Sequence, residues 1–562
     1  MTNHTFRVAH LIGASVHRPV NQSRWIAVAI VTAGMLPGIL LADAVSFMPD
    51  KPVETRQWEV VDIAFSVSDD VDRLLEVDAA ANFEGPDGTN LKVPLFYNGD
   101  HEFVLRFTPP TEGEWTFKTH STLSELDDHA GVIRATQRVE GQNGPVEISA
   151  HAKQRFAYAD GTSYFPIAFE CDWLFALDAE NRSDIPKTRT LIETIARNGF
   201  NQVVMNVYAY DVTWPSDPKL PPEFNYARPD YSPFGGTNES PDSSKLNIPF
   251  FQHLDRVIAE LHRQGVIAHL MIYVWNKQVN WPESRSDADN RYFDYVVKRY
   301  QAFPNLIWDI SKEATGYGHN DMAYITDRIE RLRGLDAFDR LVTVHDYGYC
   351  SKHADKVDFI SIQNWTSELW SAMNNVRTEN PGKPIFNIEH GGYEAGPYHV
   401  FTGDYLSAEA CLERAYQCMF AGASLTHYWQ DTSWSVVIHD PESLPEEQRP
   451  KLSYYRHLAD FVSRPEFSAL EPADRKLSSS GLCLTDNKSQ YVYYIPKDNV
   501  TVHLRLPIEN GHPLRLSWLN PHTGEVIQLP QQLWQKHLDV PRPAWSHFGI
   551  LIVDVDAPKN GP

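Results

Sequence analysis

Hydrophobic residues change their spacing twice along the chain, which divides most of it into three regions. In residues 52–145 they alternate with polar residues, as at Val61, Ile63, Phe65 and Val67, and turn-forming stretches such as "GPDGTN" separate the runs. A period of two with frequent turns is typical of antiparallel strands. We therefore predict a small antiparallel β-sandwich over residues 52–145.

Residues 155–462 combine short apolar runs with helical patterns. In "NIPFFQHLDRVIAELHRQG" apolar residues recur every three or four positions, Pro249 lies in the first turn, and Gly265 follows the last. Proline at the start and glycine after the end are common limits of an α-helix. The run "VIAHLMIYVW" comes next, and the same order of helix, glycine and strand occurs around Gly199. Repetition of this unit indicates a parallel sheet with crossover helices.

The number of strand-length apolar runs in this central region defines the predicted architecture. They cover residues 164–170, 201–208, 266–274, 305–311, 341–345, 358–364, 384–389 and 424–429. Eight strands alternating with helices make a (β/α)8 barrel. An open doubly wound sheet is the alternative, but no Gly-x-Gly-x-x-Gly motif follows the first strand.

Alternation returns after the barrel, in "YVYYI", "TVHLRL" and "FGILIV". This pattern predicts a second antiparallel β-sandwich over residues 470–556. The predicted fold class is therefore α/β, a (β/α)8 TIM barrel flanked by two small antiparallel β-sandwich domains.

The N-terminus has the pattern of a targeting segment. Three arginines precede the apolar run "WIAVAIVTAGMLPGILLADA", which ends in the small residues Ala42 and Ala44. We predict that residues 1–44 are a cleaved secretory signal, so that the mature protein is secreted or periplasmic and has no membrane contact. An uncleaved membrane anchor is the alternative, although Pro37 and two glycines weaken it.

Composition narrows the classes of partner. The chain has 15 Trp, 25 Tyr and 27 Phe, which is typical of a folded protein, and its net charge of −23 makes nucleic acid and anionic membranes poor partners. Five cysteines are too few, and odd in number, for a disulfide scaffold. Cys411 and Cys418 are about 10 Å apart along a predicted helix, too far to bridge. A Cys171–Cys350 bond stays open, but we favour buried free thiols.

Candidate catalytic residues follow the predicted barrel strands, because the active site of such a barrel lies where its strands end. Glu313 and Glu389 come at well-separated strand ends, and two carboxyls suit glycoside hydrolysis: one protonates the leaving oxygen and the other attacks the anomeric carbon. Aromatic rings among their neighbours suit the apolar faces of sugars. The predicted substrate-binding residues are Asp172, Trp173, Tyr208, Trp275, Lys312, His345, Asn364, Trp365, His390, Tyr393, Trp429 and Trp434.

Each of these assignments has an alternative. Glu313 alone could be a solvent-facing loop residue, and Glu394 competes with Glu389 as the nucleophile. We prefer Glu389 because it directly ends an apolar strand. The tryptophans, Trp429 excepted, could equally pack in the core.

A metal site and a long loop are the other features weighed. His345, Asp346, His390 and His399 invite a metal hypothesis, but no His-Glu-x-x-His motif or paired ligand spacing supports it, and we predict no metal or cofactor. Residues 209–248 are rich in Pro, Tyr and Asp and show no periodicity. We expect this loop to form one wall of the cleft, with a disordered insertion as the alternative.

Two strand segments resemble a known enzyme clan. "PNLIWDISKE" and "KPIFNIEHGGYE" are similar to the acid/base and nucleophile segments of the large clan of retaining glycoside hydrolases built on (β/α)8 barrels. The resemblance implies that Glu313 is the acid/base and Glu389 the nucleophile. Trp429, in "HYWQDTSW", resembles the tryptophan that stacks under the sugar in that clan.

The order of domains resembles bacterial apiosidase-like proteins more closely. The stretch "EGPDGTNLKVPLFYNGDHEFVLRFTPPTEGEWTF" is similar to a domain of formerly unknown function that precedes such barrels, and "LSWLNPHTGE" lies in a segment similar to the collagen-binding-type β-sandwich that often follows them. The resemblance implies a secreted retaining glycoside hydrolase acting on a plant or algal polysaccharide or oligosaccharide.

Lys312 departs from the clan, which usually has asparagine before the acid/base. An ammonium beside Glu313 would lower the pKa of that carboxyl, which does not suit a general acid. Either Lys312 points away, or it contacts an acidic or sulfated sugar. The same departure supports a second hypothesis, a catalytically degenerate barrel that acts as a carbohydrate-binding or surface-adhesion protein. Retaining catalysis predicts carboxyl groups about 5–5.5 Å apart.

Overall fold

The computed structural model describes residues 44–49, 51–68, 73–400, 403–473 and 481–557. The predicted signal segment, residues 1–44, lies outside the described residues except for its last position. No helix within the described ranges is long and apolar enough to cross a bilayer. All five cysteines are described, and each is a buried free thiol, as expected.

Eight parallel strands form the central barrel and confirm the predicted fold class. They are β13 (Ile167–Glu170), β14 (Gln202–Asn206), β17 (Ile267–Val274), β18 (Leu306–Lys312), β19 (Val342–His345), β20 (Ile360–Gln363), β21 (Ile385–Glu389) and β23 (Ala423–Trp429). Their hydrogen-bonded order is β19-β18-β17-β14-β13-β23-β21-β20, so the strands follow the chain around the barrel. Nearly every residue in them is buried, as expected for strands covered on both faces.

Side chains close the barrel between β19 and β20, which the backbone ladder leaves unpaired. The Thr343 hydroxyl donates to the carbonyl oxygen of Phe359 (3.0 Å) and lies 3.2 Å from the hydroxyl of Ser361. The Asp358 carboxylate accepts a hydrogen bond from the backbone N–H of Val342 (2.7 Å). The ring of strands is therefore nearly complete, and the ends of all eight strands meet at one face.

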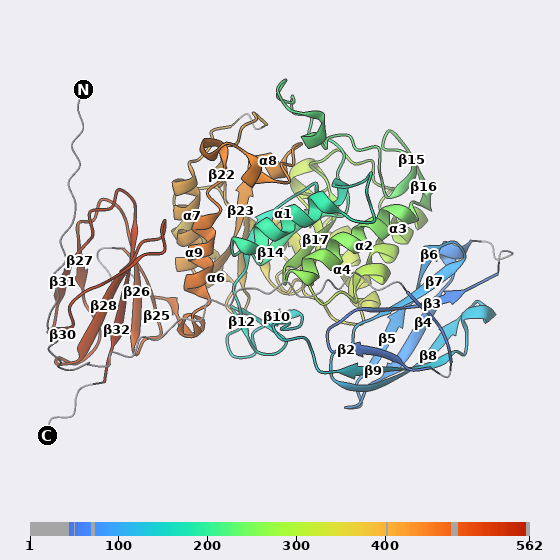
Figure 1. The fold of residues 1–562 in the computed structure, drawn as a ribbon, viewed down its shortest axis with the longest axis horizontal. Coiled ribbons are helices and arrows are strands. Elements are labelled where there is room, and N and C mark those ends of the chain that lie inside the picture. The colour runs from blue at the N-terminus through green and yellow to red at the C-terminus, as the bar shows by residue number, and fades with distance from the viewer. Residues whose placement is uncertain (1–43, 50, 69–72, 401–402, 474–480, 558–562) are drawn as a thin grey trace, which may run out of the picture. The chain divides into compact units, whose positions relative to one another are not determined.

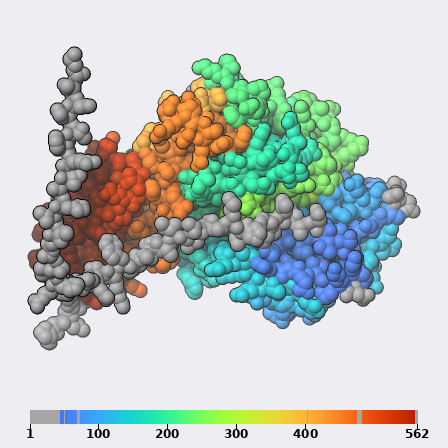
Figure 2. Space-filling model, viewed as in Figure 1, coloured from blue at the N-terminus to red at the C-terminus, as the bar shows by residue number. Residues whose placement is uncertain are grey.

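Helices cover the outside of the barrel (Figure 1). The principal ones are α1 (Pro186–Arg197), α2 (Ile248–Arg263), α3 (Asp287–Tyr300), α4 (Met322–Leu335), α6 (Leu369–Glu379), α7 (Ala408–Phe420) and α9 (Ser453–Val462). Pro249 lies in the first turn of α2, and Gly265 just after it has φ 69°, as the sequence pattern predicts. The side chains of Ser286 and Ser407 accept N–H groups at the starts of α3 and α7. Figure 2 shows that side chains fill the gaps between the barrel ribbons.

The N-terminal region is a sandwich of two sheets. One sheet has the order β1-β3-β7-β6 and the other β2-β9-β8-β4-β5. Their bounds are β1 (Val45–Ser46), β2 (Val53–Arg56), β3 (Val61–Ser66), β4 (Ala79–Glu84), β5 (Asn90–Pro94), β6 (Phe96–Gly99), β7 (Glu102–Phe107), β8 (Gly113–Ser121) and β9 (Ala130–Thr136). The rings of Phe83 and Phe107 stack 3.9 Å apart inside it. Most strand pairs are antiparallel, as predicted. The pairs β1–β3 and β2–β9 differ from the prediction, because they are parallel.

The C-terminal region contains a second pair of sheets, in which every strand pair is antiparallel within the described residues. The larger has the order β24-β25-β26-β32-β28-β29, with β30 beside β28, and the smaller pairs β27 with β31. Their bounds are β24 (Glu471–Pro472), β25 (Leu482–Thr485), β26 (Gln490–Ile495), β27 (Thr501–Leu504), β28 (Pro513–Leu519), β29 (Val526–Gln528), β30 (Gln532–Leu533), β31 (Leu538–Pro541) and β32 (Gly549–Val555). Trp518 and Trp534 are buried in its core.

Two further pieces of sheet flank the barrel. The strands β10 (Val146–Ile148), β11 (Phe156–Tyr158) and β12 (Ser163–Tyr164) form a small antiparallel sheet just before β13. The loop 209–248, expected to lack periodic structure, contains a hairpin of β15 (Phe234–Thr237) and β16 (Ser240–Leu246). The alternation of apolar and polar residues that marks a hairpin is interrupted here, because Gly236 has φ 74° and the register of the two strands shifts between Phe234 and Gly235.

A buried ion-pair cluster joins the N-terminal sandwich to the barrel helices. Arg106 of β7 donates to Asp62 (2.7 and 2.8 Å) and to Asp255 of α2 (3.0 Å). Arg299 of α3 also donates to Asp255 (2.6 and 2.9 Å). Burial acts to raise the pKa of Asp255, but the two guanidinium groups outweigh it and the pKa lies below its usual value.

We expect Asp255→Asn to lower the free energy of unfolding by about 3–5 kcal/mol, because two buried guanidinium groups would lose their shared counter-charge. Urea unfolding at pH 7 measures the change. Asp460→Asn, which removes an exposed ion pair with Arg456 within α9, is the matched control and should cost no more than about 0.5 kcal/mol. Because the folded pKa of Asp255 is lowered, its stabilising effect should be present at neutral pH and disappear as the pH falls through that pKa. Equal losses in the two variants would contradict the prediction.

Candidate active site

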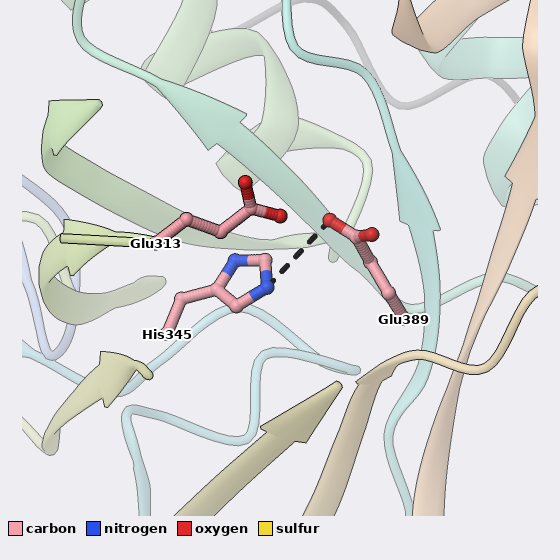
Figure 3. Close-up of side chains that lie close together, drawn as sticks. All are labelled: Glu313, His345 and Glu389. Atoms are coloured by element: carbon pink, nitrogen blue, oxygen red, sulfur yellow. Dashed lines mark ion pairs between the residues drawn. The ribbon is translucent and has the colours of Figure 1, made fainter. Parts of the chain in front are cut away.

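Glu313 and Glu389 extend toward each other across the face where the barrel strands end (Figure 3). Glu313 directly follows β18, and Glu389 is the last residue of β21. One carboxylate oxygen from each and a ring nitrogen of His345 all lie within 4.8 Å of one another. Glu389 is 2% exposed, whereas Glu313 is half-buried. The structure thus brings together the two predicted catalytic residues.

The backbone at Glu313 is held in an uncommon conformation. Its φ of 58° lies in the left-handed region, which costs a non-glycine residue about 1–3 kcal/mol. Its N–H donates to the carbonyl oxygen of His345 (3.0 Å). The carboxylate of Asp346 accepts both the N–H (2.8 Å) and the hydroxyl (2.5 Å) of Thr315. These bonds fix the segment on each side of Glu313 and so fix the direction of its side chain.

Asp309 supports the same strand ends from inside the barrel. One oxygen of its carboxylate accepts the N–H groups of His345 (2.9 Å) and Ser311 (3.2 Å). The other lies 3.0 Å from Nε2 of His269. The ladder between β18 and β19 is irregular between Asp309 and Lys312. A bulge of this kind redirects the side chains that follow it.

Lys312 points into the barrel, where carboxylates surround it. Its Nζ lies 2.5 Å from Glu170 Oε1, 3.1 Å from Glu389 Oε1 and 3.3 Å from Asp172 Oδ1. The lysine is fully buried. This placement differs from both sequence expectations, because the ammonium neither points away from the site nor has a free face for an acidic sugar. It contacts the predicted nucleophile instead.

Two charged residues of this network were absent from the predicted site. Lys277 is fully buried, and its Nζ lies 2.9 Å from Asp172 Oδ2 and 3.2 Å from the carbonyl oxygen of Ser433. Glu170 ends β13 and contacts Lys312. Glu170 could have been identified from the sequence, because it is a charged residue at the end of an apolar strand. Lys277 could not, because it lies in a loop and no sequence pattern marks its position.

Burial and neighbouring charges set the protonation of these carboxyls. Burial raises the pKa of Glu389 to about 7, Lys312 opposes this shift, and Glu313 adds to it. Burial, then the charge of Glu389, raises the pKa of Glu170 well above its usual value. For Asp172 burial acts in the same direction, but Lys277 and Lys312 outweigh it and its pKa is lowered.

The remaining polar contacts of Glu389 are with uncharged groups. Gln363, at the end of β20, donates through Nε2 to Glu389 Oε2 (2.6 Å). The Nε2 atom of His345 lies 3.6 Å from Glu389 Oε1. Burial, with the charge of Lys312, lowers the pKa of His345 well below its usual value, so the imidazole is neutral. Both oxygens of Glu389 therefore have fixed neighbours.

An aromatic cluster stands beside the carboxylates. The Tyr393 ring packs edge-on against Trp365 (4.9 Å between centroids) and lies 6.0 Å from Trp434. Trp434 stacks on Trp214 (4.8 Å), which belongs to the loop 209–248. Trp365 is 41% exposed. The loop thus supplies a ring to an aromatic wall, and its role as one side of a cleft stays a prediction.

Three predicted aromatic residues lie deeper. Trp173, Tyr208 and Trp429 are almost completely buried. Their polar atoms, Nε1 of both tryptophans and the tyrosine hydroxyl, make no hydrogen bond with any described residue. Because these atoms have almost no exposed surface, their contact with a sugar stays a prediction.

Three other predicted residues make contacts that do not involve the carboxylates of the two glutamates. Trp275 stacks on His319 (3.6 Å) and lines a separate pocket of about 210 Å³ beside β18. The N–H of Asn364 donates to the carbonyl oxygen of Glu389 (2.9 Å), a backbone role. Arg414 of α7 donates to the backbone carbonyl oxygen of His390, whose side chain is fully buried. Its role as a sugar ligand stays a prediction.

Glu394, the competing nucleophile, is engaged elsewhere. It lies in β22 (Tyr393–Glu394), and its Oε1 accepts the N–H of Lys451 (2.9 Å). Its Oε2 is 3.9 Å from His427. Burial raises its pKa to about 7. The geometry therefore favours Glu389 as the residue that pairs with Glu313.

The Glu313–His345–Glu389 cluster has the spacing needed to hold a metal ion. However, the Lys312 ammonium already lies 3.1 Å from Glu389 Oε1, the oxygen that faces His345. A second cation at this oxygen would be repelled. The donor set therefore fits carboxylate chemistry better than metal binding.

Comparisons with solved structures show the same architecture in glycoside hydrolases. A candidate glycoside hydrolase from Bacteroides vulgatus ATCC 8482 superposes with a TM-score of 0.74 at 18% identity, over 90% of this chain and 100% of the other. A family 5 glycoside hydrolase from the same organism superposes with a TM-score of 0.55 at 16% identity, over 74% and 95% of the two chains. These likenesses establish the fold. A search among curated proteins finds no match.

The family match defines the class of enzyme. Residues 150–462 match the family "Apiosidase-like, catalytic domain", and residues 54–122 match "Domain of unknown function (DUF5060)". With two facing glutamates at the strand ends of such a barrel, the protein is a glycoside hydrolase. Because the catalytic-domain match spans more than half of the chain, the protein belongs to the apiosidase-like family. The hypothesis of a catalytically degenerate barrel is not supported.

We expect Glu389→Gln to lower kcat roughly 10⁴-fold or more, the scale observed when a catalytic nucleophile is removed. Glu394→Gln, a matched change at a buried glutamate five residues away, should retain most of the activity because its side chain contacts Lys451 and His427. Initial rates on an activated aryl glycoside, with thermal unfolding to verify folding, measure both effects. Loss of activity in Glu394→Gln alone would reverse the assignment.

Proposed function

We propose that the protein hydrolyses glycosides with retention of anomeric configuration. Glu389 attacks the anomeric carbon while Glu313 gives a proton to the leaving oxygen, and the glycosidic bond breaks. Glu313 then takes a proton from water, the water oxygen attacks the same carbon, and the bond to Glu389 breaks. The observation that carries the proposal is the approach of their carboxylate oxygens to within 4.8 Å, which leaves little room for the water of an inverting enzyme.

The different surroundings of the two glutamates support their roles. Glu389 is buried, with Lys312 beside one oxygen and Gln363 donating to the other, so its carboxylate is held in one orientation. Glu313 is half-buried and faces the open side of the site. A nucleophile needs a fixed, ionised carboxylate, whereas an acid/base must exchange protons with the leaving group and with water.

The charges at the site favour a neutral sugar as substrate. Four carboxylates, those of Glu170, Asp172, Glu313 and Glu389, face two ammonium groups, both of which are buried in ion pairs. A uronic acid or sulfated sugar would meet repulsion without a free cation. The aromatic wall provides area for the apolar faces of sugar rings. We propose a neutral plant or algal polysaccharide or oligosaccharide.

We also propose that the protein is exported, on the basis of the basic and apolar pattern of residues 1–44. Expression of the full chain in a bacterial host should give a processed protein outside the cytoplasm. N-terminal sequencing should find a start close to residue 45. An intact chain retained in the membrane fraction would favour the anchor instead.

We expect azide to rescue both active-site variants with opposite stereochemistry. In Glu389→Gly, azide should replace the missing nucleophile and give a glycosyl azide of inverted configuration. In Glu313→Ala, azide should intercept the glycosyl-enzyme from an activated substrate and give a product of retained configuration. A panel of neutral and uronic aryl glycosides, with ¹H NMR of the products, provides the measurement. Identical anomers in the two variants would contradict retention, and a preference for uronides would contradict the neutral-sugar proposal.

A further inference from the structure

Lys312 contacts the proposed nucleophile from a position that catalysis by two carboxyls does not by itself explain. Its ammonium has three N–H donors, and the three carboxylates of Glu170, Asp172 and Glu389 lie within 3.3 Å of it. The ammonium is fully buried among these carboxylates, so no face of it remains for the substrate. The lysine acts on Glu389 rather than on the sugar.

We propose that Lys312 is a positioning residue that keeps the Glu389 carboxylate ionised and oriented, and that Asp172 is its permanent counter-ion. The inference rests on the proposed function, because it assumes that Glu389 is the nucleophile. Glu170 and Asp172 flank the end of β13, and Lys312 bridges from β18 to both of them and to β21.

The catalytic cycle explains why the counter-ion is needed. When Glu389 bonds to the anomeric carbon it becomes an ester and loses its negative charge. A buried ammonium whose only partner was Glu389 would then be left uncompensated, at a cost of several kcal/mol. Because Asp172 lies 3.3 Å from Nζ and its pKa is lowered, Lys312 keeps a counter-charge throughout. Lys277, 2.9 Å from Asp172, holds that carboxylate in place.

The charged and titratable groups around Glu389 make Lys312 the cation that acts on it. They are Glu170 and Asp172 at β13, Lys312 and Glu313 at β18, His345 at β19, and Tyr393 and Tyr428 at β22 and β23. The histidine is neutral, and burial raises the pKa values of both tyrosines well above their usual value, so they are neutral as well. The other carboxylates disfavour ionisation of Glu389, and among the described residues Lys312 alone contacts it as a cation.

The pH profile of kcat/KM tests the inference, because it reports ionisation of the free enzyme. Burial raises the pKa of Glu389 to about 7 even with Lys312 present. The acidic limb of this profile is the rise of kcat/KM with pH as Glu389 ionises. Lys312→Met removes the ammonium and should move this limb to a pH about 1–3 units higher. At a pH below the limb of the variant, its kcat/KM should be at least about 10-fold lower than that of the wild type. Lys312→Asn, which introduces the residue usual in the clan, should show the same shift.

A double variant separates positioning from structural support. Lys312→Met with Glu170→Gln removes the lysine together with the charge of its nearest carboxyl partner, so it should recover folding stability while the acidic limb stays displaced. Full recovery of both kcat and the pH profile would show that Lys312 only neutralises Glu170, and would overturn the inference. The rate of trapping by a 2-deoxy-2-fluoroglycosyl fluoride should fall in both variants, because it measures attack by Glu389.

The experiment distinguishes this inference from the proposed function. Full activity of Glu389→Gln would overturn both. An inactive Glu389→Gln together with an unshifted pH profile in folded Lys312→Met, or in the double variant, would overturn the role of Lys312 alone. An upward shift in both variants would support it.

Discussion

The buried ammonium of Lys312 is the interaction on which the arrangement of the active site depends. Four carboxylates gather where the barrel strands end, and without a cation their repulsion and burial would protonate them or drive them apart. Lys312 contacts three of the four, at distances from 2.5 to 3.3 Å. Burial acts to lower the pKa of Lys312, but the neighbouring carboxyl groups, Asp172 first, outweigh it and the pKa lies well above its usual value. The lysine therefore permits strands β13, β18 and β21 to present carboxylates to one small volume.

The barrel brings the strand ends together, and local backbone irregularities set the directions of the side chains there. Parallel strands bring residues distant in sequence to one face. The direction of each side chain there depends on the last peptide units, as in the bulge before Lys312 and the positive φ of Glu313. Asp309 and Asp346 hold these units through backbone N–H groups. Strain of this kind persists where surrounding bonds fix it, and here it lies at the catalytic pair.

Charged and aromatic residues form two groups at the site. The ionic network joins residues at the ends of β13, β18 and β21, whereas the rings of Trp365, Tyr393 and Trp434 pack on one another. Lys277 connects the two groups, because its Nζ lies 2.9 Å from Asp172 and 4.8 Å from the ring centre of Trp434. In the proposed function, the carboxyl groups cleave the bond and the aromatic wall holds the sugar.

The sequence by itself determined the barrel and the flanking sheets, and it singled out the two glutamates proposed as the catalytic pair. Buried parallel strands consist of short apolar runs, and a glutamate that ends such a run, as Glu313 and Glu389 do, stands out against it. Only the tertiary structure decided the partners of those glutamates. Lys312 and Glu170 are 142 residues apart, and no spacing in the chain indicates their contact. The bulge before Lys312 and the positive φ of Glu313 were likewise set by tertiary contacts, because a side chain at a strand end follows the local backbone and its neighbours rather than its residue type.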